Sequence, residues 1–277
     1  LGMGLDDFEN LDSDEVFVGR FTYDLFEESK VGTIFTHGDP QSNLNNQLAG
    51  VDLNLRSSNW WNEQSVSWHG FYMTSDDENE NSDDVIGTHF TFPNYPFRAS
   101  GHWVRTGENF NPALGFVRRR GGESTGLGFT YYFEQPENEL LEDISVGAEY
   151  DRYEWLDGDL DSDELEINLI GIRTLAGDFL GLEVEFELDI LQEPFEIIDE
   201  VIIPSSEYKG VDFELEFRSS SNRPIFGEFE IAYGHFYGGK ATNAEIDLSW
   251  RPSKYFQLDF EIASTMARLP QDNFEVL

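Results

Sequence analysis

Strict alternation of apolar and polar side chains is the feature that most limits how this chain can fold. The clearest run extends from Leu180 to Ile190, where apolar residues take every second position and glycine or acidic residues take the positions between. A period of two indicates a β-strand with two unlike faces, because successive side chains point to opposite sides. Strands in soluble proteins usually have about 5–6 residues, whereas a tilted strand needs roughly 9–11 to cross a bilayer. The pattern therefore predicts a membrane-spanning strand.

The same alternation recurs and predicts about fourteen antiparallel strands. We expect them at residues 15–25, 30–38, 47–56, 64–74, 84–92, 97–106, 123–134, 143–155, 162–173, 179–190, 208–219, 225–237, 241–251 and 255–266. Short connections such as Phe26–Ser29 and Thr174–Asp178 alternate with longer ones such as Ser75–Asp83 and Gly107–Gly122. Short turns at one rim and longer loops at the other are typical of outer-membrane barrels.

The predicted fold class is all-β: an antiparallel up-and-down transmembrane β-barrel of about 14 strands, complete or in part. A soluble, secreted, acidic β-rich binding protein with one wet face is the alternative, and it explains the strand length and the turn asymmetry less well. We expect residues 1–277 to form a single barrel domain, with 1–14 as an irregular lead-in. The chain begins at Leu1 and has no apolar run of about 18 residues, so we read it as a piece of a longer protein with no transmembrane helix.

Composition narrows the function classes. The chain has 55 acidic and 17 basic residues, a formal net charge of −38, which argues against nucleic acid as a partner. High charge with few aromatic residues is typical of disorder, but 24 Phe, 11 Tyr and 6 Trp indicate a folded chain. The absence of cysteine excludes disulfides, a thiolate nucleophile and a cysteine-based zinc site.

Alternation also predicts where many acidic side chains point. If the apolar positions face lipid, the acidic positions between them face the lumen, because a charge facing lipid costs a few kcal/mol near the midplane. Such a wall attracts cations, so cations or small solutes are the expected partners; a merely hydrated wall is the alternative. The predicted wall residues are Glu164, Glu166, Glu183, Glu185, Glu187, Asp189, Asp212, Glu214, Glu216, Glu245, Asp247, Asp259 and Glu261.

A basic cluster stands apart from this wall. Arg118, Arg119 and Arg120 follow one another in a long connection, and three consecutive arginines cannot all point one way on a strand. We expect a loop that folds inward and pairs with the acidic wall, constricting the lumen. Contact with anionic lipopolysaccharide, or a solvated loop with weak local ion pairs, are the alternatives.

Two further motifs are weaker. Asp157, Asp159, Asp161 and Asp163 place carboxylates at alternate positions, as calcium loops do. Ser162 and Asn168 replace the glycine and glutamate of the EF-hand pattern, so a low-affinity calcium or magnesium site competes with a solvated acidic loop. No other cofactor is expected.

The segment Gly122–Gly126 matches the nucleophile-elbow string around Ser124. That motif requires a strand, a turn and a helix, and here a strand follows. His69, His89, His102 and His235 are candidate bases, but the sequence places none of them beside Ser124. We therefore expect no enzymatic activity, with an outer-membrane hydrolase as the second alternative.

Three segments resemble a known family: Asn111–Arg120, Glu193–Tyr208 and Trp250–Ser253. They resemble the barrel region of the bacterial domain of unknown function 5916 family, in which a carbohydrate-binding-family-nine-like module usually precedes an outer-membrane barrel. That module has no counterpart in this chain. The resemblance implies location in the bacterial outer membrane, contact with the bilayer and lipopolysaccharide, and a channel or platform in saccharide or other nutrient uptake. It implies no catalytic residues and no oligomeric state.

Overall fold

A computed structural model describes residues 2–4, 15–42, 45–78, 82–135, 137–198, 201–270 and 273–276. Among these residues there is no helix long and apolar enough to cross a membrane. Within the predicted lead-in, Gly2–Gly4 form the short strand β1, which pairs with the next strand. Residues 1 and 5–14 of the lead-in lie outside the described residues.

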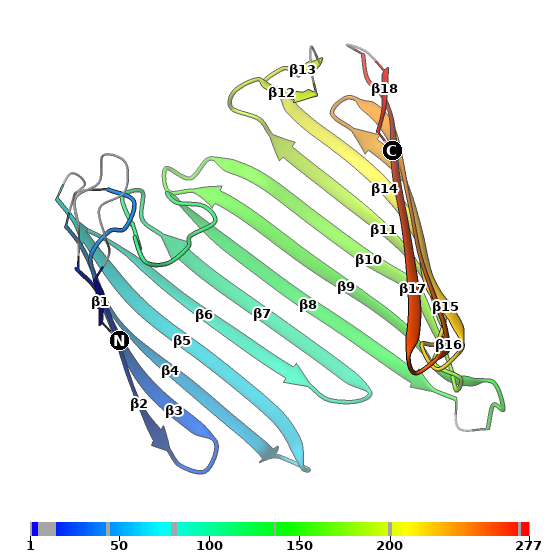
Figure 1. Cartoon of the computed structure of the whole chain (residues 1–277), viewed down its shortest axis with the longest axis horizontal. Coiled ribbons are helices and arrows are strands. Elements are labelled where there is room, and N and C mark those ends of the chain that lie inside the picture. The colour runs from blue at the N-terminus through cyan, green and yellow to red at the C-terminus, as the bar shows by residue number, and fades with distance from the viewer. Residues whose placement is uncertain are drawn as a thin grey trace. The chain divides into compact units, whose positions relative to one another are not determined.

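Fourteen long strands, each of 9–15 residues, make up most of the described chain (Figure 1). Their positions agree with the predicted segments to within a few residues. They are β2 (Glu15–Leu25), β3 (Ser29–His37), β4 (Asn46–Trp60), β5 (Gln64–Asp77), β6 (Asp83–Pro93), β7 (Phe97–Thr106), β8 (Gly122–Glu134), β9 (Leu141–Trp155), β10 (Leu160–Thr174), β11 (Phe179–Ile190), β14 (Glu207–Arg218), β15 (Ile225–Phe236), β16 (Gly239–Ser253) and β17 (Phe256–Arg268).

The strand order in the sheet follows the chain order, from β1 to β11 and then from β14 to β18 (Asn273–Val276). The ladders between consecutive strands are antiparallel, as between β4 and β5 or β15 and β16. The predicted all-β, antiparallel, up-and-down fold is therefore confirmed. The strand pairings of the described residues do not include closure into a barrel.

One local feature differs from the sequence prediction. The long connection after β11 contains a separate hairpin, formed by β12 (Phe195–Ile198) and β13 (Val201–Ile203). The connection between β15 and β16 is short, in agreement with the predicted segments 225–237 and 241–251: it is only Tyr237 and Gly238, whose φ angles are 43° and 80°. Positive φ at both central residues is the geometry of the tightest hairpin turns.

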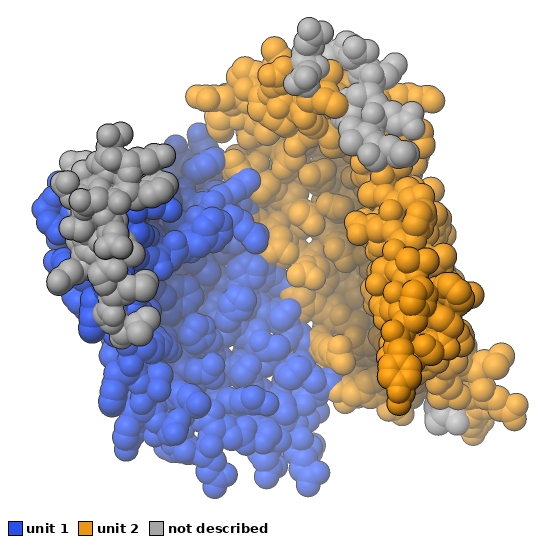
Figure 2. All heavy atoms as spheres, in the orientation of Figure 1, with its two compact units in different colours: residues 1–94, 99–127, 153–159 blue, residues 95–98, 128–152, 160–277 orange. Residues whose placement is uncertain are grey.

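The chain divides into two compact units, coloured separately in Figure 2. Unit 1 comprises residues 1–94, 99–127 and 153–159, and unit 2 comprises residues 95–98, 128–152 and 160–277. Each has a small apolar cluster: Leu48, Val85 and Phe110 in unit 1, and Val201, Ile203 and Leu269 in unit 2. In unit 2 the β12–β13 hairpin supplies two of the three buried side chains of its cluster.

Most large apolar side chains of the long strands are exposed instead. Leu180, Leu182 and Phe186 on β11 are 41%, 36% and 43% exposed, and Leu258 and Phe260 on β17 exceed 50%. Only ten apolar residues are buried among the described ones. On β17 the apolar side is therefore left largely uncovered by the rest of unit 2, and on β11 Val184, at 7%, is the buried exception.

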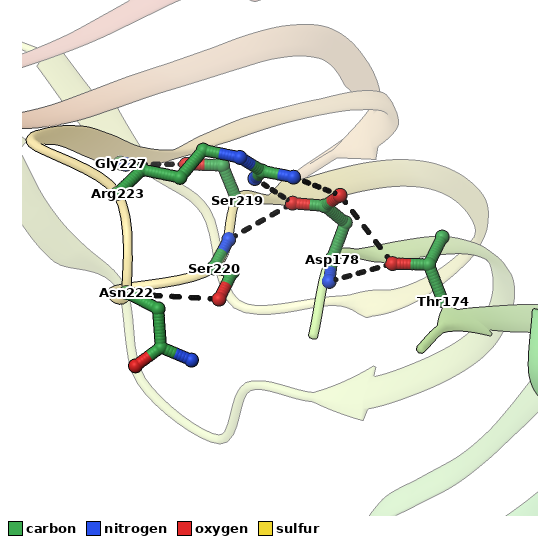
Figure 3. Close-up of polar contacts among 7 residues, drawn as sticks. All are labelled: Thr174, Asp178, Ser219, Ser220, Asn222, Arg223 and Gly227. Carbon is green, nitrogen blue, oxygen red and sulfur yellow. Dashed lines mark hydrogen bonds and ion pairs between the residues drawn. The ribbon is translucent and has the colours of Figure 1, made fainter. Parts of the chain in front are cut away.

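A polar cluster joins two of the short turns of unit 2 (Figure 3). Asp178, in the turn after β10, accepts hydrogen bonds from the Ser220 backbone N–H (2.9 Å) and from the Arg223 guanidinium (2.7 Å to Nη2). Its own N–H donates to the Thr174 hydroxyl at 3.0 Å. Gly177 precedes it with a φ of 87°, a conformation that favours glycine. These bonds hold the pKa of Asp178 well below its ordinary value, because Arg223 and the Ser220 N–H stabilise the carboxylate.

We predict that Asp178→Asn lowers the melting temperature at pH 7 by a few degrees, since it removes the charge that Arg223 contacts. A lowered pKa in the folded state stabilises above the unfolded pKa of about 3.9, and this contribution is lost as the pH falls through the folded value. The difference in melting temperature between the two proteins should therefore shrink below about pH 4. Thermal unfolding from pH 7 downward, with Glu63→Gln as an exposed turn control, measures this. A difference that does not change with pH contradicts the assignment.

Candidate functional site

The ladders of unit 2 place all thirteen predicted wall residues on one face of the sheet, which we call the acidic face. Carboxylates stand directly opposite one another on neighbouring strands. Glu166 pairs with Glu185 across β10 and β11, and Glu185 pairs with Asp212 on β14. Glu183 pairs with Glu214 in the same way. The complete set is Glu164, Glu166, Glu183, Glu185, Glu187, Asp189, Asp212, Glu214, Glu216, Glu245, Asp247, Asp259 and Glu261.

Two glutamates that the sequence prediction omitted belong to the same face. Glu230 on β15 pairs with both Glu216 and Glu245, and Glu228 pairs with Asp247. They alternate with Phe229 and Ile231, so the period-two pattern of their own strand could have identified them. A concave pocket of about 270 Å³ opens on this face, lined largely by carboxylates and including Glu166, Glu185, Glu214 and Glu230.

Among the residues that the structure describes, Arg218 is a basic partner of the acidic face. Arg218 donates two hydrogen bonds to Glu228, from Nη2 to Oε1 at 3.0 Å and from Nε to Oε2 at 3.1 Å. Its guanidinium also forms an ion pair with Glu216. Asp259 accepts a hydrogen bond from the Ser249 hydroxyl at 2.6 Å. Like charges at cross-strand positions repel, so this face requires water or cations for its stability.

Three carboxylates of this face come close enough to share a ligand. They are Glu245, Asp247 and Glu261, and one carboxylate oxygen from each lies within 4.8 Å of the oxygens from the other two.

The predicted calcium loop is arranged differently from this cluster. Asp157 and Asp159 are exposed in the turn after β9, with the Asp159 N–H donating to Asp157 at 3.0 Å. Asp161 and Asp163 lie on β10, where Asp163 is 3.9 Å from Arg152. A cation at these four residues stays a prediction.

The loop of residues 107–121, between β7 and β8, is fixed to unit 1 by buried polar groups. Asn46, only 1% exposed, donates from its side-chain amide to the Asn111 carbonyl at 2.9 Å. The Asn111 N–H donates to the hydroxyl of Ser75 at 2.8 Å, and its side-chain amide donates to Asp77 at 3.0 Å. The sequence prediction missed these anchors, because they lie 34–65 residues from Asn111 along the chain.

Apolar contacts hold the same loop against the sheet. Phe110 is buried with Leu48 and Val85, and Val117 packs against this cluster. Two of the three arginines of the loop make contacts within unit 1. Arg120 donates to the Asn111 side-chain oxygen at 2.8 Å, and the Arg119 guanidinium lies 4.8 Å from the centre of the Tyr153 ring. Arg118 is exposed. Pairing of these arginines with the acidic face stays a prediction.

Ser124 lies on β8, in a continuous strand rather than in a turn before a helix. The nucleophile-elbow setting is therefore missing at Ser124. The structure nevertheless places a histidine beside it, with 3.1 Å between His102 Nε2 and Ser124 Oγ. His102 is on β7, and its ring stacks on that of His89 on β6. His235, another candidate base, lies on β15 in unit 2.

Comparison by sequence identifies no relative of this chain. No family model matches the chain, and no curated protein matches it. Among solved structures, the crystal structure of Acinetobacter baumannii OccAB2 is similar over 90% of this chain and 87% of that chain, with 8% sequence identity and a TM-score of 0.45. A likeness this low assigns neither a family nor a function to the chain.

We predict that Asn46→Ala loosens the loop of residues 107–121. Removing a buried hydrogen-bonding partner costs about 1–3 kcal/mol, and here it leaves the Asn111 carbonyl without the Asn46 amide. Arg118–Arg120 are cleavage sites for trypsin, so the rate of cleavage there reports how often the loop leaves the sheet. Cleavage should accelerate in Asn46→Ala and stay at the wild-type rate in Asn54→Ala, an exposed asparagine on the same strand. Equal rates in all three proteins contradict the anchoring role.

Proposed function

We propose that this chain forms the wall of a β-barrel in a bacterial outer membrane and acts as a passive, non-enzymatic channel that favours cations. The observation that carries the proposal is the exposed apolar side of the long strands. Four apolar residues at every second position of β14 are all 38–53% exposed: Val211, Phe213, Leu215 and Phe217. Soluble proteins rarely expose contiguous apolar surface on this scale, whereas a lipid-facing strand requires it.

The preference for cations follows from the opposite side of the same strands. Glu214 and Glu216 alternate with the exposed apolar residues of β14. Each has a carboxylate directly opposite on one neighbouring strand, Glu183 on β11 for Glu214 and Glu230 on β15 for Glu216. A wall with one sign of charge raises the local concentration of counter-ions and repels co-ions. Rings of Asp and Glu are the usual selectivity elements of cation channels.

The loop of residues 107–121 supports a constriction of this passage. Its apolar side packs on Leu48 and Val85, which belong to strands β4 and β6, and its arginines lie on an anchored backbone. In the proposed barrel the loop narrows the lumen and adds positive charge. Contact of the arginines with lipopolysaccharide is the second role that this charge fits.

Membership of the domain of unknown function 5916 family, and a part in saccharide or other nutrient uptake, are included in the proposal on the resemblance of three segments alone. The soluble binding protein is less well supported, because its apolar strand positions would face water. The hydrolase alternative has one specific observation in its favour, the His102–Ser124 contact at 3.1 Å. A serine-directed fluorophosphonate probe that labels wild-type protein but not Ser124→Ala would favour the hydrolase.

We predict that Phe213→Arg impairs assembly into the outer membrane. An arginine facing lipid near the midplane costs about 2–4 kcal/mol, whereas at an exposed position of a soluble protein the change is nearly neutral. Glu214→Gln, the next residue and on the opposite face, is the matched control and should assemble normally. Membrane fractionation of expressing cells, followed by heat-modifiability on detergent gels, measures assembly. Wild-type protein found in the soluble fraction, or Phe213→Arg assembling like wild type, contradicts the membrane proposal.

We predict that the double variant Glu185→Gln/Glu214→Gln lowers cation selectivity. The reversal potential in planar bilayers under a KCl gradient should move towards zero, because two carboxylates of the acidic face are neutralised. Glu193→Gln, an exposed residue between β11 and β12, should keep the wild-type reversal potential. A wild-type channel that favours anions, or a double variant with unchanged selectivity, contradicts the role of the acidic face.

A further inference from the structure

Three of the five histidines of the chain lie side by side on one face of unit 1, and we call them the histidine row: His69, His89 and His102. His69 on β5 stands directly opposite His89 on β6. The rings of His89 and His102 are 5.3 Å apart between centroids and 16° from parallel. Three imidazoles on adjacent strands at one level of the sheet form a group that no single strand could produce.

We propose that the histidine row binds a divalent transition-metal ion of the zinc class. Imidazole nitrogen is a ligand of choice for Zn²⁺, Ni²⁺ and Cu²⁺, whereas Ca²⁺ and Mg²⁺ prefer oxygen. Each Zn–N bond is about 2.0–2.1 Å, so two nitrogens on one zinc lie within roughly 4 Å of each other. The ligand nitrogens of the three side chains do not all lie within 4.8 Å of one another in the structure, so metal binding requires the rings to rotate. The 5.3 Å between the centroids of His89 and His102 is within reach of such a rotation.

The side chains that flank the row are uncharged: Asn54 stands opposite His69, and Ser124 contacts His102. The Phe71 ring stacks on His69 with 5.7 Å between centroids. Apolar contacts of this kind limit water access around a metal site and tune it.

Ser124 orients the third ligand. When His102 Nε2 donates its proton to Ser124 Oγ at 3.1 Å, Nδ1 carries the lone pair that binds a metal. Metal-bound histidines generally donate their other N–H in this way, which fixes the tautomer and the ring. A metal site therefore explains the contact between His102 and Ser124 without a nucleophile elbow and without catalysis.

The row is chemically distinct from the acidic face. It belongs to unit 1, whereas the acidic face belongs to unit 2. His69 is six residues before Ser75 on β5, or about 20 Å at the usual rise of a strand, so the row also lies apart from the anchors of the loop of residues 107–121. Metal binding can therefore be measured on purified protein whether or not the chain conducts ions.

The test is a calorimetric titration of the purified full chain with Zn²⁺ in excess Mg²⁺, which occupies carboxylates. Wild-type protein should retain one tight Zn²⁺ site per chain. His89→Ala should abolish it, and Ser124→Ala should weaken it about tenfold or more. His37→Ala, a histidine of unit 1 outside the row, and Glu185→Gln, on the acidic face, should bind Zn²⁺ like wild type. Loss of all Zn²⁺ uptake in Mg²⁺, or unchanged uptake by His89→Ala, overturns the proposal.

A second measurement covers the case in which His89→Ala does not fold, as judged by circular dichroism. Electron paramagnetic resonance of wild-type protein with one equivalent of Cu²⁺ should show superhyperfine splitting from imidazole nitrogens. A spectrum with oxygen ligands alone overturns the proposal. Zinc binding without channel activity would contradict the proposed function and leave this inference standing. Channel activity without zinc binding would do the opposite.

Discussion

The two faces of the long strands determine most of what this structure can do. Successive side chains on a strand point to opposite sides, so a register slip by one residue would exchange the faces. On β11 such a slip would put Glu183, Glu185 and Glu187 among the apolar residues and Val184 among the carboxylates. The free-energy cost of that exchange fixes the register. The same register then forces like charges into direct opposition, as at Glu183 and Glu214.

Local periodicity explains why so much of the fold could be predicted from the sequence. Segments 15–25, 97–106 and 179–190 coincide with β2, β7 and β11, because alternation and turn residues are properties of short stretches. The acidic face was predictable for the same reason, and Glu228 and Glu230 were missed although their own strand alternates in the same way.

Contacts between distant strands could not be predicted, because no local pattern specifies which residues stand opposite. Asn46 and Asn111 are 65 positions apart, and neither has a neighbour that marks it as an anchor. His102 and Ser124 are 22 positions apart and meet only through the pairing of their strands. The β12–β13 hairpin was hidden for another reason, since its strands of four and three residues are too short to show a period.

The net charge of the chain is −38, and the described structure shows that the acidic side chains of the two units differ in how closely basic side chains pair with them. On the face of unit 1 that carries the histidine row, Asp52 has a close partner, Arg20, at 2.6 Å. On the acidic face of unit 2, Glu166, Glu185 and Asp212 oppose one another across three strands. Carboxylates attract cations largely through charge, whereas imidazoles select by ligand chemistry. The proposed attraction of cations and the proposed metal binding therefore depend on different strands, so a substitution on one face leaves the chemistry of the other in place.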